Sequence, residues 1–107
     1  MAKKVDFVLQ FGKEATDIKM LVIEGRNCIN AVRPTGSRWI CHLPEMEIGQ
    51  EDREDDIDIF AVVAGLPHTR CDVEAVLDGN ATAFRGNQFD KRGRFILNVA
   101  IPAGGQK

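Results

Sequence analysis

The chain has 107 residues, enough for one hydrophobic core and too few for two domains of ordinary size. Its 44% hydrophobic and 28% charged residues are typical of a globular protein, and its net charge of -2 gives no general attraction for nucleic acid or acidic membranes. We therefore expect a single domain over residues 1–107 that binds charged partners only through local patches.

The sequence predicts a soluble, cytoplasmic protein. Its longest apolar run, Ile59–Ala64, is far shorter than a membrane span, and Met1–Lys4 lead into an alternating segment without the apolar core of a signal peptide. Three cysteines, Cys28, Cys41 and Cys71, cannot all pair within one chain, and the cytosol keeps thiols reduced. We expect free thiols that bind no metal.

Alternation of apolar and polar residues predicts strands in the first part of the chain, beginning with Val5–Phe11. In the second predicted strand, Ile18–Glu24, both faces are apolar, as expected for a strand covered on both sides. One face carries Ile18, Met20 and Val22, and the other carries Leu21 and Ile23. A helix over Lys13–Ile23 is the alternative, and it is disfavoured because β-branched residues crowd its end.

The middle of the chain predicts two more strands. Gly25–Asn27 is typical of a tight turn, which leads into a short strand over Cys28–Arg33. A loop at residues 34–37 is followed by a strand over Arg38–Leu43, and residues 45–56 are expected to be the least regular part. The inward side chains of that strand are expected to be Trp39, Cys41 and Leu43.

The C-terminal half predicts four further strands, over Ile57–Val63, Val73–Leu77, Thr82–Arg85 and Phe95–Ile101. The strongest hairpin signal in the chain is Asp78-Gly79, between the second and third of these. About eight short strands with turn signals at intervals of roughly 8 to 12 residues predict an all-β protein. We expect an antiparallel two-sheet β-sandwich, immunoglobulin-like or jelly-roll-like, with Trp39 and Phe95 in its core.

A family resemblance follows from the segment 72–104. Its elements are the Asp78-Gly79 turn, a second turn at Asp90–Gly93, an alternating strand from Phe95, and Pro102-Ala103-Gly104. This pattern resembles the immunoglobulin-like, transthyretin-type sandwiches of carboxypeptidase regulatory-like domains. The resemblance implies a binding or structural accessory rather than an enzyme.

Two pairs of residues, Cys41-His42 and His68 with Cys71, make a Cys2His2 zinc site worth considering. Adjacent residues on a strand point to opposite faces, so the favoured interpretation is a buried Cys41 and an exposed His42. A nucleophilic Cys/His pair is less favoured still, because no Gly-rich elbow and no third orienting group accompany it. The sequence predicts no catalytic residues and no cofactor.

An acidic run occupies Glu45–Asp58, with eight acidic residues against Arg53. Carboxylate oxygens at such density could bind a hard cation, and the candidate ligands are Asp52, Asp55, Asp56 and Asp58. The run lacks the ordered spacing and the glycine of a calcium loop. A solvated charge run is therefore the favoured interpretation.

A basic segment follows near the C-terminus, with Arg85, Lys91, Arg92 and Arg94 against Asp90. Bases beside exposed aromatic rings can bind single-stranded nucleic acid, and Phe89 is the one candidate for an exposed ring, since Phe84 and Phe95 are in register with the core. A hairpin with solvated charges is favoured, so nucleic acid is not an expected partner. Likewise, Trp39 is a core anchor rather than a carbohydrate platform.

Together these patterns predict a non-enzymatic protein-binding or assembly module, or an accessory subunit, that forms a homo-oligomer. The predicted protein-binding residues form two patches of opposite charge, one of Arg85, Lys91, Arg92 and Arg94 and one of Glu51, Asp52, Glu54 and Asp55. The alternative is a ligand-binding module, lectin-like or calcium-dependent, that uses the acidic loop at 45–58. A hydrolytic or redox enzyme ranks third.

Overall fold

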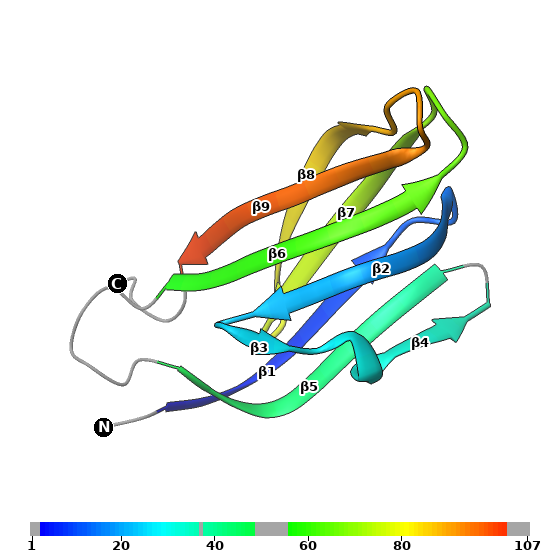
Figure 1. Ribbon diagram of the computed structural model, residues 1–107. Coiled ribbons are helices and arrows are strands. Elements are labelled where there is room, and N and C mark those ends of the chain that lie inside the picture. The colour runs from blue at the N-terminus through cyan, green and yellow to red at the C-terminus, as the bar shows by residue number, and fades with distance from the viewer. Residues whose placement is uncertain (1–2, 37, 49–55, 103–107) are drawn as a thin grey trace.

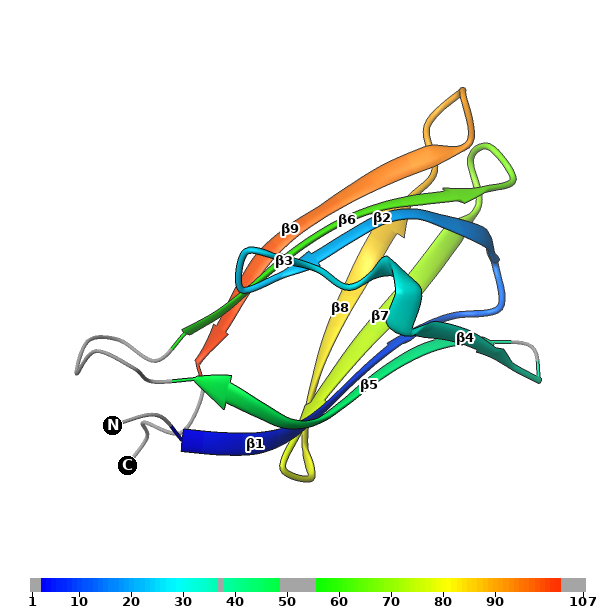
Figure 2. The ribbon, with the colours of Figure 1, turned by 60° about the horizontal axis from the view of Figure 1, so that its bottom comes forward.

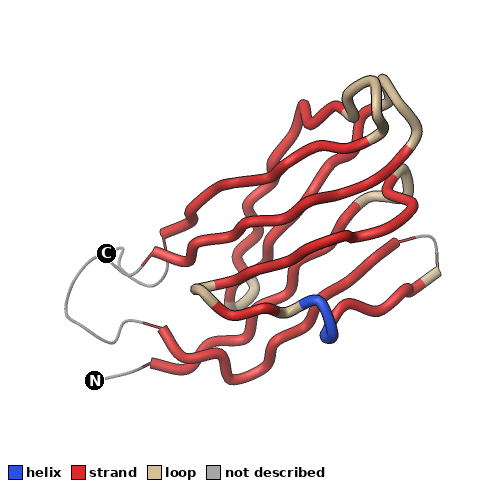
Figure 3. The backbone as a smooth tube through the Cα atoms, in the orientation of Figure 1, coloured by secondary structure: helices blue, strands red, loops and turns tan. Residues whose placement is uncertain are grey.

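The computed structural model describes residues 3–36, 38–48 and 56–102, and it is an all-β protein with no α-helix in those residues (Figure 3). The strands are β1 (Lys3–Phe11), β2 (Ala15–Ile23), β3 (Arg26–Asn27), β4 (Val32–Thr35), β5 (Arg38–Ile48), β6 (Asp56–Gly65), β7 (Arg70–Leu77), β8 (Asn80–Gln88) and β9 (Arg94–Pro102). A 3-10 turn at Ile29–Ala31, the blue segment of Figure 3, precedes β4.

The strands form two antiparallel sheets that face each other, so the predicted β-sandwich is confirmed (Figures 1 and 2). One sheet has five strands in the order β4-β5-β1-β7-β8, and the other has four in the order β3-β2-β6-β9. The chain crosses between the sheets after β1, before β4, after β5, after β6 and after β8. Strands distant in sequence therefore lie side by side, as β2, β6 and β9 do.

The core lies between the sheets and is built by alternate residues of each strand. Phe7, Leu9 and Phe11 of β1 and Phe95 of β9 are buried in it, as is Cys41 of β5. Trp39 is half-buried at the margin of this core, where its indole Nε1–H donates to the Ala15 carbonyl at 3.1 Å. The core assignment of Phe95 is confirmed, whereas Trp39 packs against the core from its edge.

The faces of β2 differ from the sequence prediction. The pairing of β2 with β6 shifts register between Ile18 and Met20, so a bulge at this point turns the chain by one residue. Ile18 is buried together with Leu21 and Ile23, while Met20 points outward. The expectation that β2 is covered on both sides is wrong, because no described element covers its outer side.

The predicted strand at Cys28–Arg33 is confirmed only at Val32 and Arg33, where β4 begins, and residues 28–31 are not strand. The tight turn lies earlier, at Glu24-Gly25, where both residues have positive φ (53° and 77°), and β3 follows it directly. The Asn27 side-chain oxygen then accepts a hydrogen bond from the Ile29 N–H at 3.0 Å, which bends the chain into the 3-10 turn. The Asx turn formed by Asn27 thus overrides the β propensity of residues 28–31.

The Asp78-Gly79 hairpin is confirmed. Both residues have positive φ (48° and 85°), as a type I′ turn requires, and they join β7 to β8 with Leu77 opposite Asn80. Several strands are longer than alternation predicted. Strand β5 continues to Ile48 and β8 reaches Gln88, so part of the segment expected to be irregular is strand.

Candidate interaction surface

The outer face of the four-stranded sheet is apolar across its centre. Val62 of β6 lies opposite Met20 of β2 on one side and Ile96 of β9 on the other, so the three outward side chains form one row across the sheet. In the next row, Phe60 lies between Val22 and Asn98. We call this surface the outer apolar face, and its members are Met20, Val22, Phe60, Val62, Ala64 and Ile96.

The two ends of the central row are the most exposed. Ile96 is 64% exposed and Met20 is 45% exposed, while the residues between them are half-buried by their neighbours. A monomeric protein rarely exposes a contiguous apolar patch larger than a few hundred Å², and larger patches mark surfaces that bind other proteins or membranes. This face is therefore the strongest candidate for a functional surface in the described residues.

Charges flank the outer apolar face with opposite sign at its two ends. Arg94 begins β9 opposite Ala64, in a row that also contains Asp17 of β2, whose carboxylate pairs with Lys19 at 3.0 Å. Asp58 lies on β6 opposite Ala100, toward the other end. Glu24 adjoins Asp58, because its carboxylate accepts a hydrogen bond from the Asp58 N–H at 2.7 Å. The face thus has a basic end and an acidic end, separated by apolar side chains.

The turn before β9 is held by one carboxylate. The Asp90 Oδ1 atom accepts hydrogen bonds from the N–H groups of Arg92 at 2.8 Å and Arg94 at 3.1 Å. These bonds, chiefly that of Arg94, lower the pKa of the Asp90 carboxyl. The charged form of Asp90 therefore fixes the backbone where the basic end of the outer apolar face begins.

The predicted basic patch is divided between the two sides of the sandwich. Lys91 and Arg92 lie in the turn that leads to Arg94, so these three are close together in the chain and in space. Arg85 is instead on β8, in the other sheet. The predicted acidic partners Glu51, Asp52, Glu54 and Asp55 lie outside the described residues.

Arg85 lines a shallow hollow of about 470 Å³ on the outer face of the five-stranded sheet. Its charged lining consists of Lys13, Glu14, Arg38, Asp72, Glu74 and Arg85. Acidic and basic groups are equal in number, so the hollow favours neither anions nor cations. It gives no basis for assigning a ligand.

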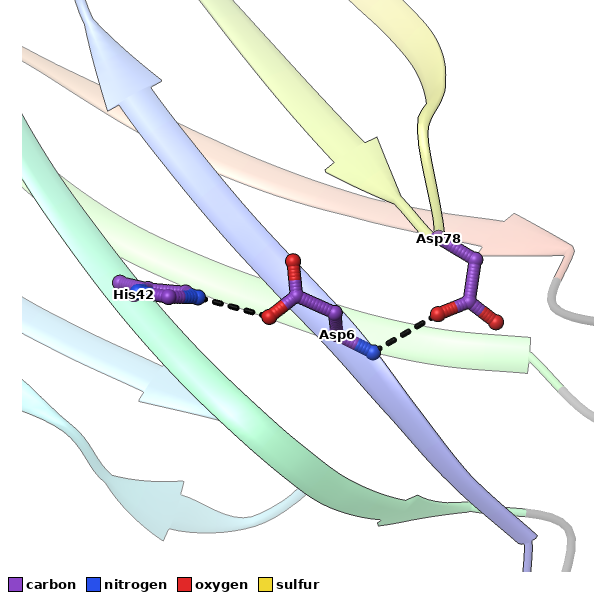
Figure 4. Close-up of polar contacts among 3 residues, drawn as sticks. All are labelled: Asp6, His42 and Asp78. Atoms are coloured by element: carbon purple, nitrogen blue, oxygen red, sulfur yellow. Dashed lines mark hydrogen bonds and ion pairs between the residues drawn. The ribbon is translucent and has the colours of Figure 1, made fainter.

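A polar network on the same sheet links Asp6, His42 and Asp78 (Figure 4). The His42 Nε2 and Asp6 Oδ1 atoms are 2.7 Å apart, and the Asp6 N–H donates to the Asp78 carboxylate at 2.8 Å. Asp6 stands where β1 shifts register against β5, and the Asp78 N–H returns a hydrogen bond to its carbonyl at 2.8 Å. The bonds between Asp6 and Asp78 therefore satisfy the backbone of a bulge, and the exposed His42–Asp6 pair adds a side-chain contact between β5 and β1.

The side chains considered for zinc do not converge. Cys41 is buried, and His42 is exposed on the opposite face of β5. Cys41, Leu9 and Ala75 lie in one row across β5, β1 and β7. Cys71 is four residues before Ala75 on β7, so it is well away from Cys41. No group of three or more His, Cys, Asp or Glu side chains within residues 3–36, 38–48 and 56–102 could hold a metal ion. Of the candidate cation ligands, Asp52 and Asp55 lie outside the described residues. Only the backbone of Asp56 is described, and Asp58 is exposed on β6.

The prediction of Phe89 as an exposed aromatic ring is wrong. Its side chain is fully buried, with its ring centroid 5.0 Å from that of Phe95. Phe89 follows β8, and its N–H and carbonyl are bound by Thr69 and His68 in the loop after β6, which places the ring over the end of the core. The basic segment therefore has no exposed aromatic ring beside it, since Phe84 is half-buried against the core.

No protein-family model, no curated protein and no solved structure matches this chain. Within the described residues, no helix is long and apolar enough to cross a membrane.

The outer apolar face was missed in the sequence, although a signal was present. Met20–Ile23 and Ile59–Ala64 are apolar at consecutive positions, so each strand has apolar side chains on both faces. One explanation of that pattern is a strand whose two faces are both covered by other parts of the protein. A sheet with one buried and one exposed apolar face is the explanation that the structure supports.

Proposed function

We propose that this chain is a non-enzymatic protein-binding module, an assembly component or an accessory subunit, that docks through its outer apolar face. The observation that carries this proposal is the row from Met20 through Val62 to Ile96, which is apolar and uncovered. Burial of such a surface against a partner is the main source of affinity in protein association. The charged ends would orient the partner.

The resemblance to transthyretin-type, carboxypeptidase regulatory-like domains is consistent with this role, since those domains are binding or structural accessories. The two-sheet sandwich supports the coarse part of that resemblance. Membership in this particular group, and the cytoplasmic location expected from the sequence, stay predictions.

The proposal is tested by the native mass of the protein in extracts of the cells that produce it. Wild-type protein should migrate in a complex of defined size, larger than the 11.9 kDa chain. Ile96→Lys places a charge in the outer apolar face and should shift most of the protein to the monomer position.

The matched control is Ala83→Lys, at another exposed position on β8 of the other sheet, which should leave the complex unchanged. A wild-type protein that migrates as a free monomer would overturn the proposal. So would a complex that Ile96→Lys leaves intact.

A further inference from the structure

The edges of the two sheets differ in how well they are protected against pairing with another chain. Proteins commonly shorten, bend or interrupt edge strands, because a free edge is a template for pairing. Strand β3 has two residues, and β4 contains Pro34. Strand β8 is interrupted near Gly86, whose φ is 83°, where the register with β7 shifts.

Strand β9 has none of these protections along its length. It pairs with β6 without interruption from Arg94 to Pro102, and it has no charged residue between those two. Among the described strands, only β6 pairs with it, so its other side is open. Figure 2 shows β9 at the margin of the four-stranded sheet.

The hydrogen bonds at the start of β9 show which backbone groups face the open side. The Gly65 N–H donates to the Gly93 carbonyl at 2.8 Å, so the odd-numbered residues of this strand point toward β6. The Arg94 carbonyl instead accepts from the Asp90 N–H at 2.9 Å, on the side away from β6. By alternation, the N–H and carbonyl groups of Ile96, Asn98 and Ala100 face the open edge.

We infer that a second copy of this chain pairs with it through β9 against β9, about a two-fold axis at Asn98. This inference goes beyond the proposed function, because it uses the edge of the sheet beside the outer apolar face and leaves that face uncovered. Asn98 then lies opposite the partner's Asn98, and Ile96 lies opposite the partner's Ala100. Every open N–H and carbonyl of these residues gains a ladder hydrogen bond.

The residues that bracket this register limit the pairing to these positions. The Arg94 N–H and carbonyl are already bound by Asp90, and Pro102 has no N–H to donate. A shifted register would place Arg94 or Pro102 opposite a residue whose N–H and carbonyl face the open edge. At least one of those two groups would then have no hydrogen-bond partner. Because the contact uses the same edge of both copies, it closes as a dimer and leaves no β9 edge for a third chain.

The same arrangement matches the charges of the outer apolar face. Antiparallel pairing brings the basic end of one copy beside the acidic end of the other. Arg94 lies opposite the partner's Pro102, next to the row that contains the partner's Ala100 and Asp58. The row of Ile96 and Val62 continues into the partner's Ala100 and Asp58. The Phe60 rows of the two copies meet at the Asn98 pair, so the two outer apolar faces lie edge to edge on one continuous sheet.

Sedimentation of the purified full chain tests the pairing. Wild-type protein at high micromolar concentration in low salt should sediment at twice the mass of the 11.9 kDa chain. Asn98→Pro removes an N–H that faces the open edge and no bond to β6, so the variant should fold and dimerise at least about tenfold more weakly. Asn98→Ala, which keeps the N–H, should stay within about twofold of wild type.

A cross-link at the two-fold axis tests the register without proline. Paired residues of this kind have Cα atoms about 5.5 Å apart, within the range that a disulfide spans. Asn98→Cys should therefore form a disulfide dimer under mild oxidation. Ile96→Cys should not, because the partner's Ile96 lies four residues away along the ladder.

A charge exchange tests the orientation. Arg94→Glu and Asp58→Lys should each weaken dimerisation roughly threefold to tenfold in low salt, and high salt should weaken the wild-type dimer. The double variant restores opposite charges at the two ends and should recover most of the loss.

The outcomes separate this inference from the proposed function. A purified chain that stays monomeric, or a disulfide dimer that forms equally from Ile96→Cys, would overturn the β9 pairing. If the chain is monomeric when pure but migrates in an Ile96-dependent complex in extracts, the proposed function stands and the partner is another protein. If it is a monomer in both, both proposals fail.

Discussion

The ring of Phe89 occupies the space that a side chain at Gly65 would need. A Cβ atom at position 65 would collide with the ring and with the Glu14 carbonyl. The ring also contacts Phe95, with the two ring planes tilted by 53°. Gly65 ends β6 and Phe89 follows β8, so this contact joins the two sheets at the end of the sandwich where their loops gather (Figure 1).

Gly65→Ala should therefore destabilise the fold by about 1–3 kcal/mol, because the ring has no room to accommodate the methyl group. Urea denaturation followed by Trp39 fluorescence measures the loss. Phe89→Leu removes part of the ring and should reduce the cost of Gly65→Ala in the double variant. If the two costs simply add, the collision is not the cause.

The free energy of unfolding should fall at high pH because of the buried cysteine thiols. Burial, with a smaller contribution from Cys28, raises the pKa of the Cys41 thiol from 9.0 to about 11. The folded state thus keeps the proton that the unfolded chain releases above pH 9.0. The resulting stabilisation is complete below pH 9.0 and is lost progressively from there upward.

Unfolding free energies measured from pH 8 to pH 11 should fall more steeply for wild type than for Cys41→Ala. Cys71, whose pKa burial also raises, should contribute a second part of the slope. Alkylation at pH 8 should modify the half-buried Cys28 before the buried Cys41 and Cys71. Equal slopes for wild type and Cys41→Ala would contradict the assignment.

The network of Asp6, His42 and Asp78 contains a carboxylate that binds the backbone and an exposed ion pair, and their contributions to stability should differ. Asp78→Ala removes the acceptor of the Asp6 N–H and places alanine at a φ of 48°, so a loss of about 1 kcal/mol or more is expected. Asp78→Asn keeps an acceptor and tolerates that φ, and it serves as the control. His42→Ala removes only an exposed pair and should cost less than about 0.5 kcal/mol.

Thermal unfolding monitored by circular dichroism compares the three variants. A His42→Ala loss equal to that of Asp78→Ala would show that the ion pair contributes more than the bulge does.

Period-2 alternation was enough to predict the sandwich, because the two sheets bury one face of nearly every strand. It placed β1, β6, β7 and β9 close to their observed positions, and the Asp78-Gly79 turn fixed the β7–β8 hairpin. It failed at Ile18–Met20, where a bulge changes which residues face inward. It also failed at Cys28–Arg33, where the Asn27 side chain caps a turn.

The candidate site was less accessible to sequence reasoning. Charge runs were the visible signal, but Arg85 and Arg94 lie in different sheets because the chain crosses over between β8 and β9. The outer apolar face combines Met20, Val62 and Ile96, which come from three strands far apart in the sequence. Only the order β2-β6-β9 brings them into one row, and local pattern cannot predict that order.

The two aromatic residues predicted for the core should differ in what they contribute to stability. Phe95 is 8% exposed and contacts the Phe89 ring, so Phe95→Ala should leave a cavity and cost about 3–5 kcal/mol. For a domain of this size, such a loss is a large fraction of the total stability of about 5–15 kcal/mol. Phe95→Leu, which fills part of the cavity, should retain enough stability to be measured.

Trp39 lies at the margin of the core, and its truncation should cost less than that of Phe95. Part of its contribution is the hydrogen bond from its indole to the Ala15 carbonyl, where β2 begins. Trp39→Phe keeps an aromatic ring and removes that bond, for an expected loss of about 1 kcal/mol. Chemical denaturation followed by far-UV circular dichroism measures the Phe95 and Trp39 variants without the tryptophan signal. A Trp39→Ala loss as large as that of Phe95→Ala would show that β5 is held to the core as firmly as β9.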